Sequence, residues 1–228
     1  MTQLIIGIGH KARHGKDSFA RAVEDYYSTL SAVIVKHIAG NSIIVQRTAF
    51  ANALRKEVND FLASPYGKVW VNAGMTSIKG LAIDSNVFLP DWVVPDPNPE
   101  ITADTPLGKH SKLLQWWGTE YRRAQDAQYW VKKWKASVWP TADIVIVSDM
   151  RFLNEAAAIR ENNGFTVNVT RLNQDGTRYI DPSRSPSHPS ETELDGYNYD
   201  AYIMTKDAAL TGEFAVTLVH YLRALKGK

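Results

Sequence analysis

The segment GIGHKARHGKDS (7–18) places a glycine, a lysine and a hydroxyl in an order close to that of phosphate-binding loops, G-x-x-x-x-G-K-[ST]. Gly15 and Lys16 match the end of this pattern. His10 stands at its first glycine, and Asp17 follows the lysine, so the hydroxyl comes one position late, at Ser18. Such a loop needs inward-pointing backbone N–H groups, a helix N-terminus behind them and a lysine that reaches the outer phosphates. The predicted phosphate-binding residues are Lys11, Ala12, Arg13, His14, Gly15, Lys16, Asp17 and Ser18; the alternative is a solvated basic turn between a strand and a helix.

A second segment, VIVSDMRFLNEAAAIR (145–160), ends an apolar run with an acid and a nearby arginine. An acid at the carboxyl end of a parallel strand lies at the edge of the sheet where phosphates bind. Asp149 could hold Mg²⁺ there, together with Asp17 or Ser18 from the loop, because Mg²⁺ prefers oxygen ligands. Arg151 could bind a phosphate through its planar fork. The alternatives are that Asp149 caps the following helix and that Arg151 forms a surface ion pair.

The elements that must position these segments follow from periodicity. Continuous apolar runs at 4–8 and 143–147 are typical of parallel strands that are buried on both faces. Strands that alternate with helices predict an α/β fold with a parallel sheet flanked by helices. Further strands are expected at 42–48, 165–172 and 201–205, and helices at 17–30, 52–62, 112–138, 154–162 and 213–225.

Composition excludes several classes of protein. The 228 residues are 44% hydrophobic and 22% charged, which suits a globular chain with a core, and the net charge of +2 favours no polyanionic partner. Cysteine is absent, so disulfides and thiolate metal sites are excluded. No stretch approaches the roughly 18 apolar residues of a membrane span. We therefore expect a cytoplasmic chain without a membrane partner.

Five segments in order resemble the deoxynucleoside monophosphate kinases of bacteriophages. HKARHGKDS (10–18) is similar to that family's GKxxSGKD[ST] loop, in which Asp follows the lysine; His10, Arg13 and His14 depart from it. The other four segments are TAFANALRKEV (48–58), LLQWWGTEYRR (113–123), SDMRFLNEAAAIR (148–160) and HPSETELD (188–195), similar to FADPLK, LLQxxGTExxR, xDVRFPNEAxxI and HxSE. They leave mainly 64–109 unmatched.

The resemblance implies a P-loop kinase fold that transfers the γ-phosphoryl group of ATP, with Mg²⁺, to a deoxynucleoside 5′-monophosphate. The whole chain, 1–228, would be one kinase domain, with an acceptor-binding insertion at 64–140 and a lid at 173–195. Lys16, Asp149 and Arg151 would act in catalysis. Arg13 would either add positive charge at the transition state or be a surface arginine, and Arg171 would contact adenine or the lid.

The acceptor needs cations for its phosphate and groups that recognise a base. Neighbouring arginines on a helix point about 100° apart, so Arg122 and Arg123 cannot both face the acceptor. Helical spacing would place Trp116 and Glu120 on one face, with Trp116 under a base or in the core. The residues expected to bind the acceptor are Phe50, Arg55, Lys56, Gln115, Trp116, Glu120, Arg122, Arg123, Arg151, His188, Ser190 and Glu191; His188, Ser190 and Glu191 would close over substrate or cap a helix.

Two rival functions remain open at this stage. One is another small-molecule phosphate kinase of the same fold, of the phosphomevalonate kinase type, but the tryptophan-rich segment favours a planar base. The other is a kinase or ATPase that acts on a base in DNA. The small net charge argues against DNA as a partner, although KKWK (132–135) is a local basic cluster. A homodimer is compatible with the family.

Overall fold

The computed structural model describes residues 3–9, 11, 13–37, 42–65, 67, 82–84, 87–88, 111–181 and 187–227, with the backbone alone at 32–37, 82–84, 87–88 and 111–112. These residues form two compact units, one of residues 1–50 and 133–228 and the other of residues 51–132. Most of the predicted insertion at 64–109 lies outside the described residues, as do His10 and Ala12.

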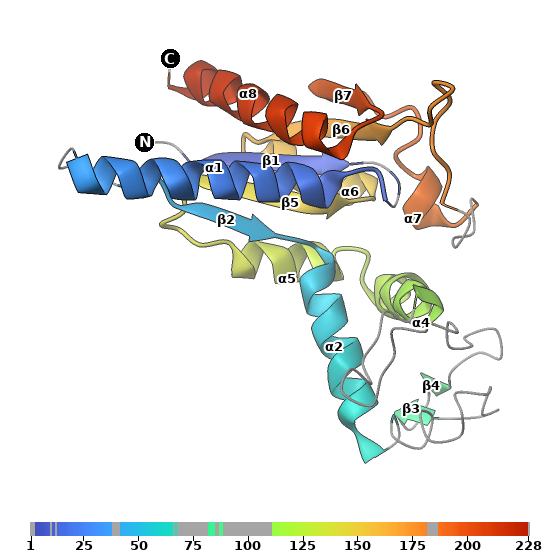
Figure 1. The fold of residues 1–228 in the computed structure, drawn as a ribbon. Helices are drawn as coiled ribbons and strands as arrows, with labels where there is room; N and C mark the ends of the chain where they lie inside the picture. Colours follow the sequence, from blue (N-terminus) through green and yellow to red (C-terminus); the bar gives the residue numbers. More distant parts are fainter. Residues whose placement is uncertain are drawn as a thin grey trace. The chain divides into compact units, whose positions relative to one another are not determined.

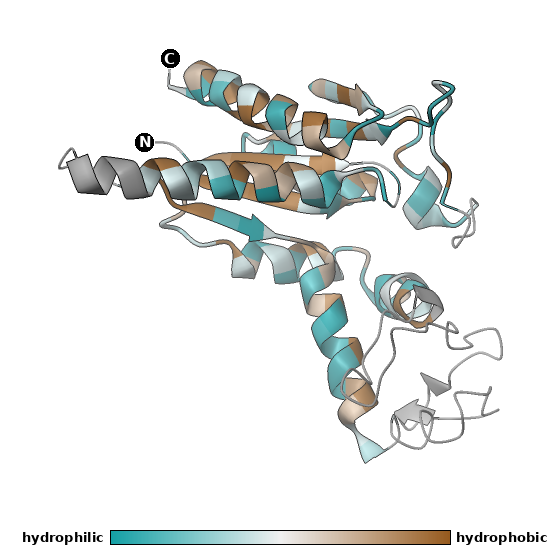
Figure 2. Cartoon of the chain, in the orientation of Figure 1, coloured by the Kyte–Doolittle hydropathy of each residue, from teal (hydrophilic) through white to brown (hydrophobic). Residues whose placement is uncertain are grey.

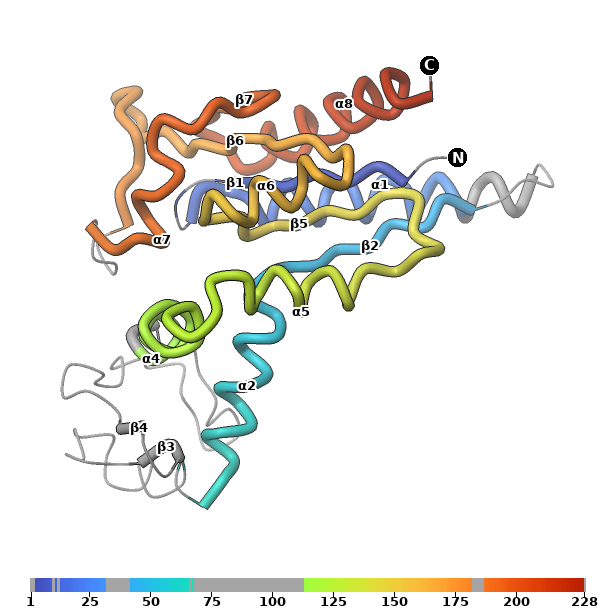
Figure 3. Tube along the Cα trace, turned by 180° about the vertical axis from the view of Figure 1, so that it is seen from behind, coloured from blue at the N-terminus to red at the C-terminus, as the bar shows by residue number. Residues whose placement is uncertain are grey.

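The first unit is built on a five-stranded, all-parallel sheet in the order β2-β5-β1-β6-β7. Figure 1 shows the strands running in one direction, with α1 and α8 on one face of the sheet; Figure 3, seen from behind, shows α6 on the other. The parallel α/β class predicted from the sequence is confirmed. The elements are β1 (Leu4–Gly9), α1 (Lys16–His37), β2 (Val45–Thr48), β5 (Ile144–Met150), α6 (Leu153–Glu161), β6 (Phe165–Arg171), α7 (Pro189–Thr192), β7 (Ala201–Thr205) and α8 (Ala208–Lys226).

The core of this unit forms where the apolar runs of β1 and β5 pair, from Leu4 opposite Ile144 to Gly7 opposite Val147; after a shift in register, Gly9 lies opposite Met150. Both strands are strongly hydrophobic (Figure 2), and their side chains pack against α1 and α8. Burial on both faces explains why these strands show continuous rather than alternating hydrophobicity. The sheet thereby fixes the carboxyl ends of β1 and β5 side by side, which positions the segments that follow them.

Several predicted boundaries in the first unit need correction. The strand expected at 42–48 begins at Val45, and the strand expected at 143–147 continues to Met150, so Asp149 lies within it. The last helix begins at Ala208 rather than 213, with Asp207 as its N-cap, whose carboxylate accepts the N–H of Ala209 at 2.7 Å.

The second unit contains α2 (Ala51–Ala63), the short strands β3 (Ala82–Asp84) and β4 (Val87–Phe88), α4 (Ser111–Trp116) and a π-helix, η1 (Trp117–Arg123). The helix α5 (Tyr129–Ser137) begins in this unit and ends in the first. The prediction of a single helix over 112–138 is therefore wrong. The segment forms α4, η1 and α5, with a turn at 127–128 before α5. Among the described residues, no helix is long and apolar enough to cross a membrane.

Candidate active site

The described part of the loop between β1 and α1 contains two residues in the left-handed region of backbone conformation. Arg13 and Gly15 both adopt positive φ angles, of 58° and 89°, and α1 begins directly afterwards at Lys16. The first intrahelical bond runs from the N–H of Phe19 to the carbonyl of Gly15, at 2.9 Å, so the amides of Asp17 and Ser18 precede the helical pattern. These amides and the positive end of a long helix favour an anion at this point.

Lys16 is the first residue of α1, and its side chain reaches back across the loop. It is only 7% exposed, and its ammonium group donates a hydrogen bond to the carbonyl of Lys11 at the other side of the loop. Burial lowers the pKa of Lys16 well below its usual range, and the nearby charge of Arg151 lowers it further. The carboxylates of Glu191, Asp149 and Asp17 act in the opposite direction and so lie near the ammonium group. The predicted lysine, acids and arginine are therefore brought together.

Asp149 and Arg151 flank Met150, which pairs with Gly9 at the end of β1. Asp149 Oδ1 accepts the N–H of Phe50 at 2.7 Å, whereas the helix that follows β5 is capped by Glu155, whose carboxylate accepts the N–H groups of Arg151 and Phe152. The alternative that Asp149 caps that helix is therefore wrong, because the N-cap residue is Phe152 and the side chain of Glu155, in the first turn, accepts its N–H.

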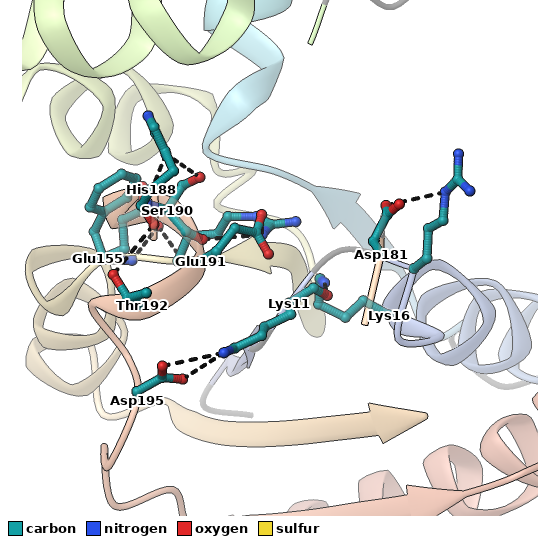
Figure 4. Close-up of polar contacts among 12 residues, drawn as sticks. Lys11, Lys16, Glu155, Asp181, His188, Ser190, Glu191, Thr192 and Asp195 are labelled. Carbon is teal, nitrogen blue, oxygen red and sulfur yellow. Dashed lines mark hydrogen bonds and ion pairs between the residues drawn. The ribbon is translucent and has the colours of Figure 1, made fainter. Parts of the chain in front are cut away.

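Arg151 does not form a surface ion pair either. Its Nη1 donates to Glu191 Oε1 at 2.7 Å and to the carbonyl of Ser190 at 3.2 Å. Figure 4 shows Ser190 and Glu191 next to each other. The side chains of Arg151 and Glu191 are only 16% and 5% exposed. Glu191 thus serves as a buried counter-ion for Arg151, and its charge also opposes the repulsion between Arg151 and Lys16.

The segment HPSE forms the start of α7. The ring Nδ1 of His188 accepts the N–H of Ser190 at 3.2 Å and lies 2.8 Å from its hydroxyl, so His188 is the N-cap. Of the two roles left open for this segment, helix capping is confirmed for His188. Figures 1 and 3 place α7 beyond the carboxyl ends of the strands, the edge at which the loop between β1 and α1 lies. Nearby, Lys11 pairs with Asp195 at 3.2 Å.

The loop is also bound to the segment after β6, which was expected to be a lid. His14 is 2% exposed; its Nε2 donates to the carbonyl of Tyr179 at 3.0 Å, and its Nδ1 accepts the N–H of Arg171 at 3.3 Å. These two bonds require one neutral tautomer. Burial, assisted by the charge of Lys16, lowers the pKa of His14 to about 4, so the ring stays neutral at physiological pH.

Two further contacts reinforce this connection. Arg13 Nε lies 3.3 Å from the buried carboxylate of Asp181, and the guanidinium of Arg171 lies 4.6 Å from the ring centroid of Tyr179. Arg13 is mostly exposed, as the surface alternative predicted, but it pairs with the lid segment. No spacing in the sequence identified Tyr179 and Asp181, because the contacts form across the fold. The role of Arg171 toward adenine stays a prediction.

The proposed magnesium ligands lie on two elements, Asp17 and Ser18 on α1 and Asp149 on β5. Asp17 is exposed on the first turn of α1, and Ser18 and Asp149 are half-buried. Among the residues with described side chains, no group of three acidic or histidine residues could enclose a metal ion. Mg²⁺ usually keeps several waters and binds one or two carboxylates together with substrate phosphates. A loop hydroxyl with Asp17 and Asp149, both close enough to raise the pKa of Lys16, fits that type of site.

The second unit holds most of the predicted acceptor residues. Trp116 is buried and stacks on Tyr121, with ring centroids 5.4 Å apart and planes 4° apart, while Glu120 is exposed. Trp116 and Glu120 therefore do not share a face, because the π-helix brings residues five apart together rather than four. Gln115 Nε2 is buried and has no hydrogen-bond partner among the described residues.

The predicted cations differ in their surroundings. Arg55 is exposed, and Lys56 pairs with Asp60 on the surface. Arg123 donates weakly, at 3.4 Å, to the carbonyl of Ala127. Arg122 donates through Nε to Glu57 at 2.8 Å and is half-buried. In the first unit, Phe50 packs on Trp134, 4.9 Å between ring centroids, so its side chain belongs to the core.

Comparison with known proteins adds no relative: no protein-family model and no curated protein matches the chain.

Proposed function

We propose that this protein is a phosphotransferase that moves the γ-phosphoryl group of ATP to a deoxynucleoside 5′-monophosphate, with Mg²⁺ bound to the nucleotide. The observation that carries the proposal is the buried Lys16 at the start of α1, with Asp149 and Arg151 close to it. Phosphoryl transfer asks a protein mainly for positioning and for positive charge around the transferred group. This cluster of charges, at the N-terminus of a long helix, is suited to that task.

In the proposed reaction an oxygen of the acceptor phosphate attacks the γ-phosphorus of ATP, the bond from the γ-phosphorus to the β–γ bridging oxygen breaks, and ADP leaves. The amides of the 13–18 loop would bind the ATP phosphates, and Lys16 would leave the carbonyl of Lys11 to contact them. Arg151, held by Glu191, would stabilise charge on the transferred group. Mg²⁺, held by Ser18, Asp17 or Asp149, would neutralise the outer phosphates.

For the acceptor, the second unit offers a half-buried arginine, Arg122, and a buried amide, Gln115 Nε2, without a hydrogen-bond partner among the described residues. The first suits a phosphate and the second the edge of a base. Trp116 is in the core and would contribute to this unit by packing. A group suited to the edge of a base favours a nucleotide over an aliphatic phosphate as the acceptor.

The test is ADP release from ATP and Mg²⁺ with each deoxynucleoside monophosphate in turn, beside mevalonate phosphate and single-stranded DNA. Stimulation by at least one free deoxynucleotide, lost in Lys16→Ala and retained in Lys132→Ala, would support the proposal. Lys132 is a suitable control because it is exposed and pairs with Asp126. Stimulation by mevalonate phosphate alone or by DNA alone would replace the proposed acceptor. No stimulation by any of them would refute the activity.

A further inference from the structure

The second unit contains a carboxylate that accepts hydrogen bonds from three side chains. Glu57, in α2, accepts from Trp117 Nε1 at 3.1 Å and from Arg122 Nε at 2.8 Å through one oxygen, and from the hydroxyl of Tyr129 through the other. The three donors come from the start of η1, its end and the start of α5. A single acidic side chain of α2 thus connects this helix to η1 and α5, whose donors lie 60 to 72 residues later in the sequence.

Glu57 is ionised at neutral pH. Burial would raise the pKa of its carboxyl, but the hydrogen bonds from Tyr129, Trp117 and Arg122, with the charge of Arg122, outweigh burial and lower it. A charged acceptor forms stronger hydrogen bonds than a neutral one. The carboxylate therefore holds its partners firmly, and it does so on the apolar stripe of α2, between Leu54 and Phe61.

Arg122 contacts two aromatic rings and binds Glu57 through Nε, while its terminal nitrogens make no hydrogen bond to the described residues. Its guanidinium carbon lies 4.6 Å from the ring centroid of Tyr121 and 5.1 Å from that of Tyr129. Only Nε is bonded to Glu57, and Nη1 and Nη2 have no hydrogen-bond partner among the described residues. A guanidinium has five N–H groups in a rigid fork, so four of them make no hydrogen bond to the described residues. They form the pair of parallel donors that phosphate accepts.

The π-helix is what produces this geometry. Tyr121 stacks on Trp116, five residues earlier, and the carbonyl of Gly118 accepts the buried indole N–H of Trp130 at 2.9 Å. Gly118 also approaches α2 closely, because a Cβ there would lie 3.0 Å from Leu54. Packing therefore holds η1 through the ring of Tyr121 and through the backbone of Gly118. This fixes the direction in which the side chain of Arg122 leaves the helix.

We propose that Glu57 is a positioning residue, which orients Arg122 so that Nη1 and Nη2 bind the phosphate of the acceptor nucleotide. The inference rests on the proposed function for the identity of the phosphate ester. Glu57 does not compete with the phosphate, because it occupies Nε and its remaining oxygen is taken by Tyr129. Arg123, whose Nη1 donates to Ala127, would not take this role.

The test compares Glu57→Gln and Arg122→Gln with Asp60→Asn. Asp60 is a matched control because it lies on the same helix, is 64% exposed and pairs only with the surface Lys56 among the described residues. Steady-state kinetics would give KM for the acceptor, KM for ATP and kcat. Calorimetry without ATP would measure binding of each deoxynucleoside monophosphate and of inorganic phosphate. Thermal unfolding would show whether each variant folds.

We expect Glu57→Gln and Arg122→Gln each to raise the acceptor KM and the phosphate Kd about tenfold, because hydrogen bonds to a charged group are lost. The ATP KM and all values for Asp60→Asn should stay within about twofold. If Glu57→Gln does not fold, Tyr129→Phe tests the same point. It removes one donor to Glu57, keeps the Glu57–Arg122 bond, and should raise the acceptor KM and phosphate Kd about threefold by loosening the carboxylate.

Each outcome is informative. Transfer with an unchanged acceptor KM and phosphate Kd in Glu57→Gln would overturn the positioning role and leave the proposed function intact. Absence of transfer in the wild type, with phosphate binding that Glu57→Gln weakens, would refute the proposed function and retain the anion site. A wild-type chain that binds neither inorganic phosphate nor any deoxynucleotide would overturn the inference.

Discussion

Replacing Glu191 by glutamine should strongly destabilise the first unit. The substitution keeps the shape of the side chain but removes the negative charge that faces Arg151 at 2.7 Å, where the two side chains are 5% and 16% exposed. Arg151 would then be a largely buried cation beside Lys16 without its paired carboxylate, and only Asp149 and Asp17 would still offset the charge of Lys16. The perturbation therefore acts on both cations of the candidate site.

The size of the effect follows from burial. Removing one partner of a buried ion pair costs about 3–5 kcal/mol, because the other charge stays desolvated. Arg151 keeps its hydrogen bond to the carbonyl of Ser190 at 3.2 Å, and its side chain is not fully buried. We therefore expect the lower end of this range, a loss of about 3 kcal/mol in the free energy of unfolding.

The assay is urea-induced unfolding at pH 7 of the wild type, Glu191→Gln, Arg151→Met and the double variant. The resulting cycle isolates the coupling energy of the pair. We expect about 2 kcal/mol, against at most about 0.5 kcal/mol for the same cycle on Lys135 and Glu161. That pair is the control, since its side chains are 45% and 65% exposed. A coupling energy for Arg151 and Glu191 no larger than the control's would refute the reasoning.

Three further predictions concern the end of β1 and the loop that follows it. The pKa of His14 is about 4 in the folded chain, against 6.5 for a free histidine, so the unfolded chain takes up the proton first as the pH falls. Between pH 6.5 and 4 the free energy of unfolding should therefore fall by up to about 3 kcal/mol more in the wild type than in His14→Gln. Urea-induced unfolding at each pH would measure it. An equal dependence of the free energy of unfolding on pH in both proteins would contradict the prediction. Gly9→Ala should cost about 1–3 kcal/mol, because its Cβ would lie 2.5 Å from the buried ring of Tyr199. Gly15→Ala meets no atom closer than 3.5 Å and should cost only about 1 kcal/mol of strain at its φ of 89°. Thermal unfolding would rank the two glycine variants, and the reverse order would show the steric argument to be wrong. Lys16→Met removes a buried ammonium group, so it should abolish ADP release while leaving the free energy of unfolding unchanged or raised by roughly 1 kcal/mol. A clear loss of stability in thermal unfolding would show that Lys16 is needed for folding.

Local patterns anticipated much of the first unit. The apolar runs at 4–8 and 143–147 became β1 and β5, and the strand at 201–205 has the observed bounds. Gly15 takes the positive φ that a tight turn into α1 requires. Such features depend on residues within a few positions of one another, so one sequence is enough to find them. The closeness of Lys16 to Asp149 and Arg151 also followed, because parallel strands end at a common edge.

The second unit was harder to anticipate. A repeat of 3.6 residues predicts Trp116 above Glu120, but the π-helix pairs Trp116 with Tyr121. The sequence did contain one indication: Glu57 is a charged residue three positions after Leu54, on a stripe that is otherwise apolar. Such a position indicates a charge on the packed face of the helix. The partner of Glu57, Tyr129, lies 72 residues away, and nothing in the spacing connects them.

The sequence by itself therefore determined the parallel α/β class, the loop that turns into a helix and the types of residue at the strand ends. Tertiary structure alone decided which charges neutralise one another, namely Glu191 with Arg151 and Glu57 with Arg122. It also decided that His14 is buried as a neutral ring between Tyr179 and Arg171. The reason is physical. Strands, turns and helix starts are set by neighbouring residues, whereas the partner of a buried charge is whatever group long-range packing brings within hydrogen-bond distance.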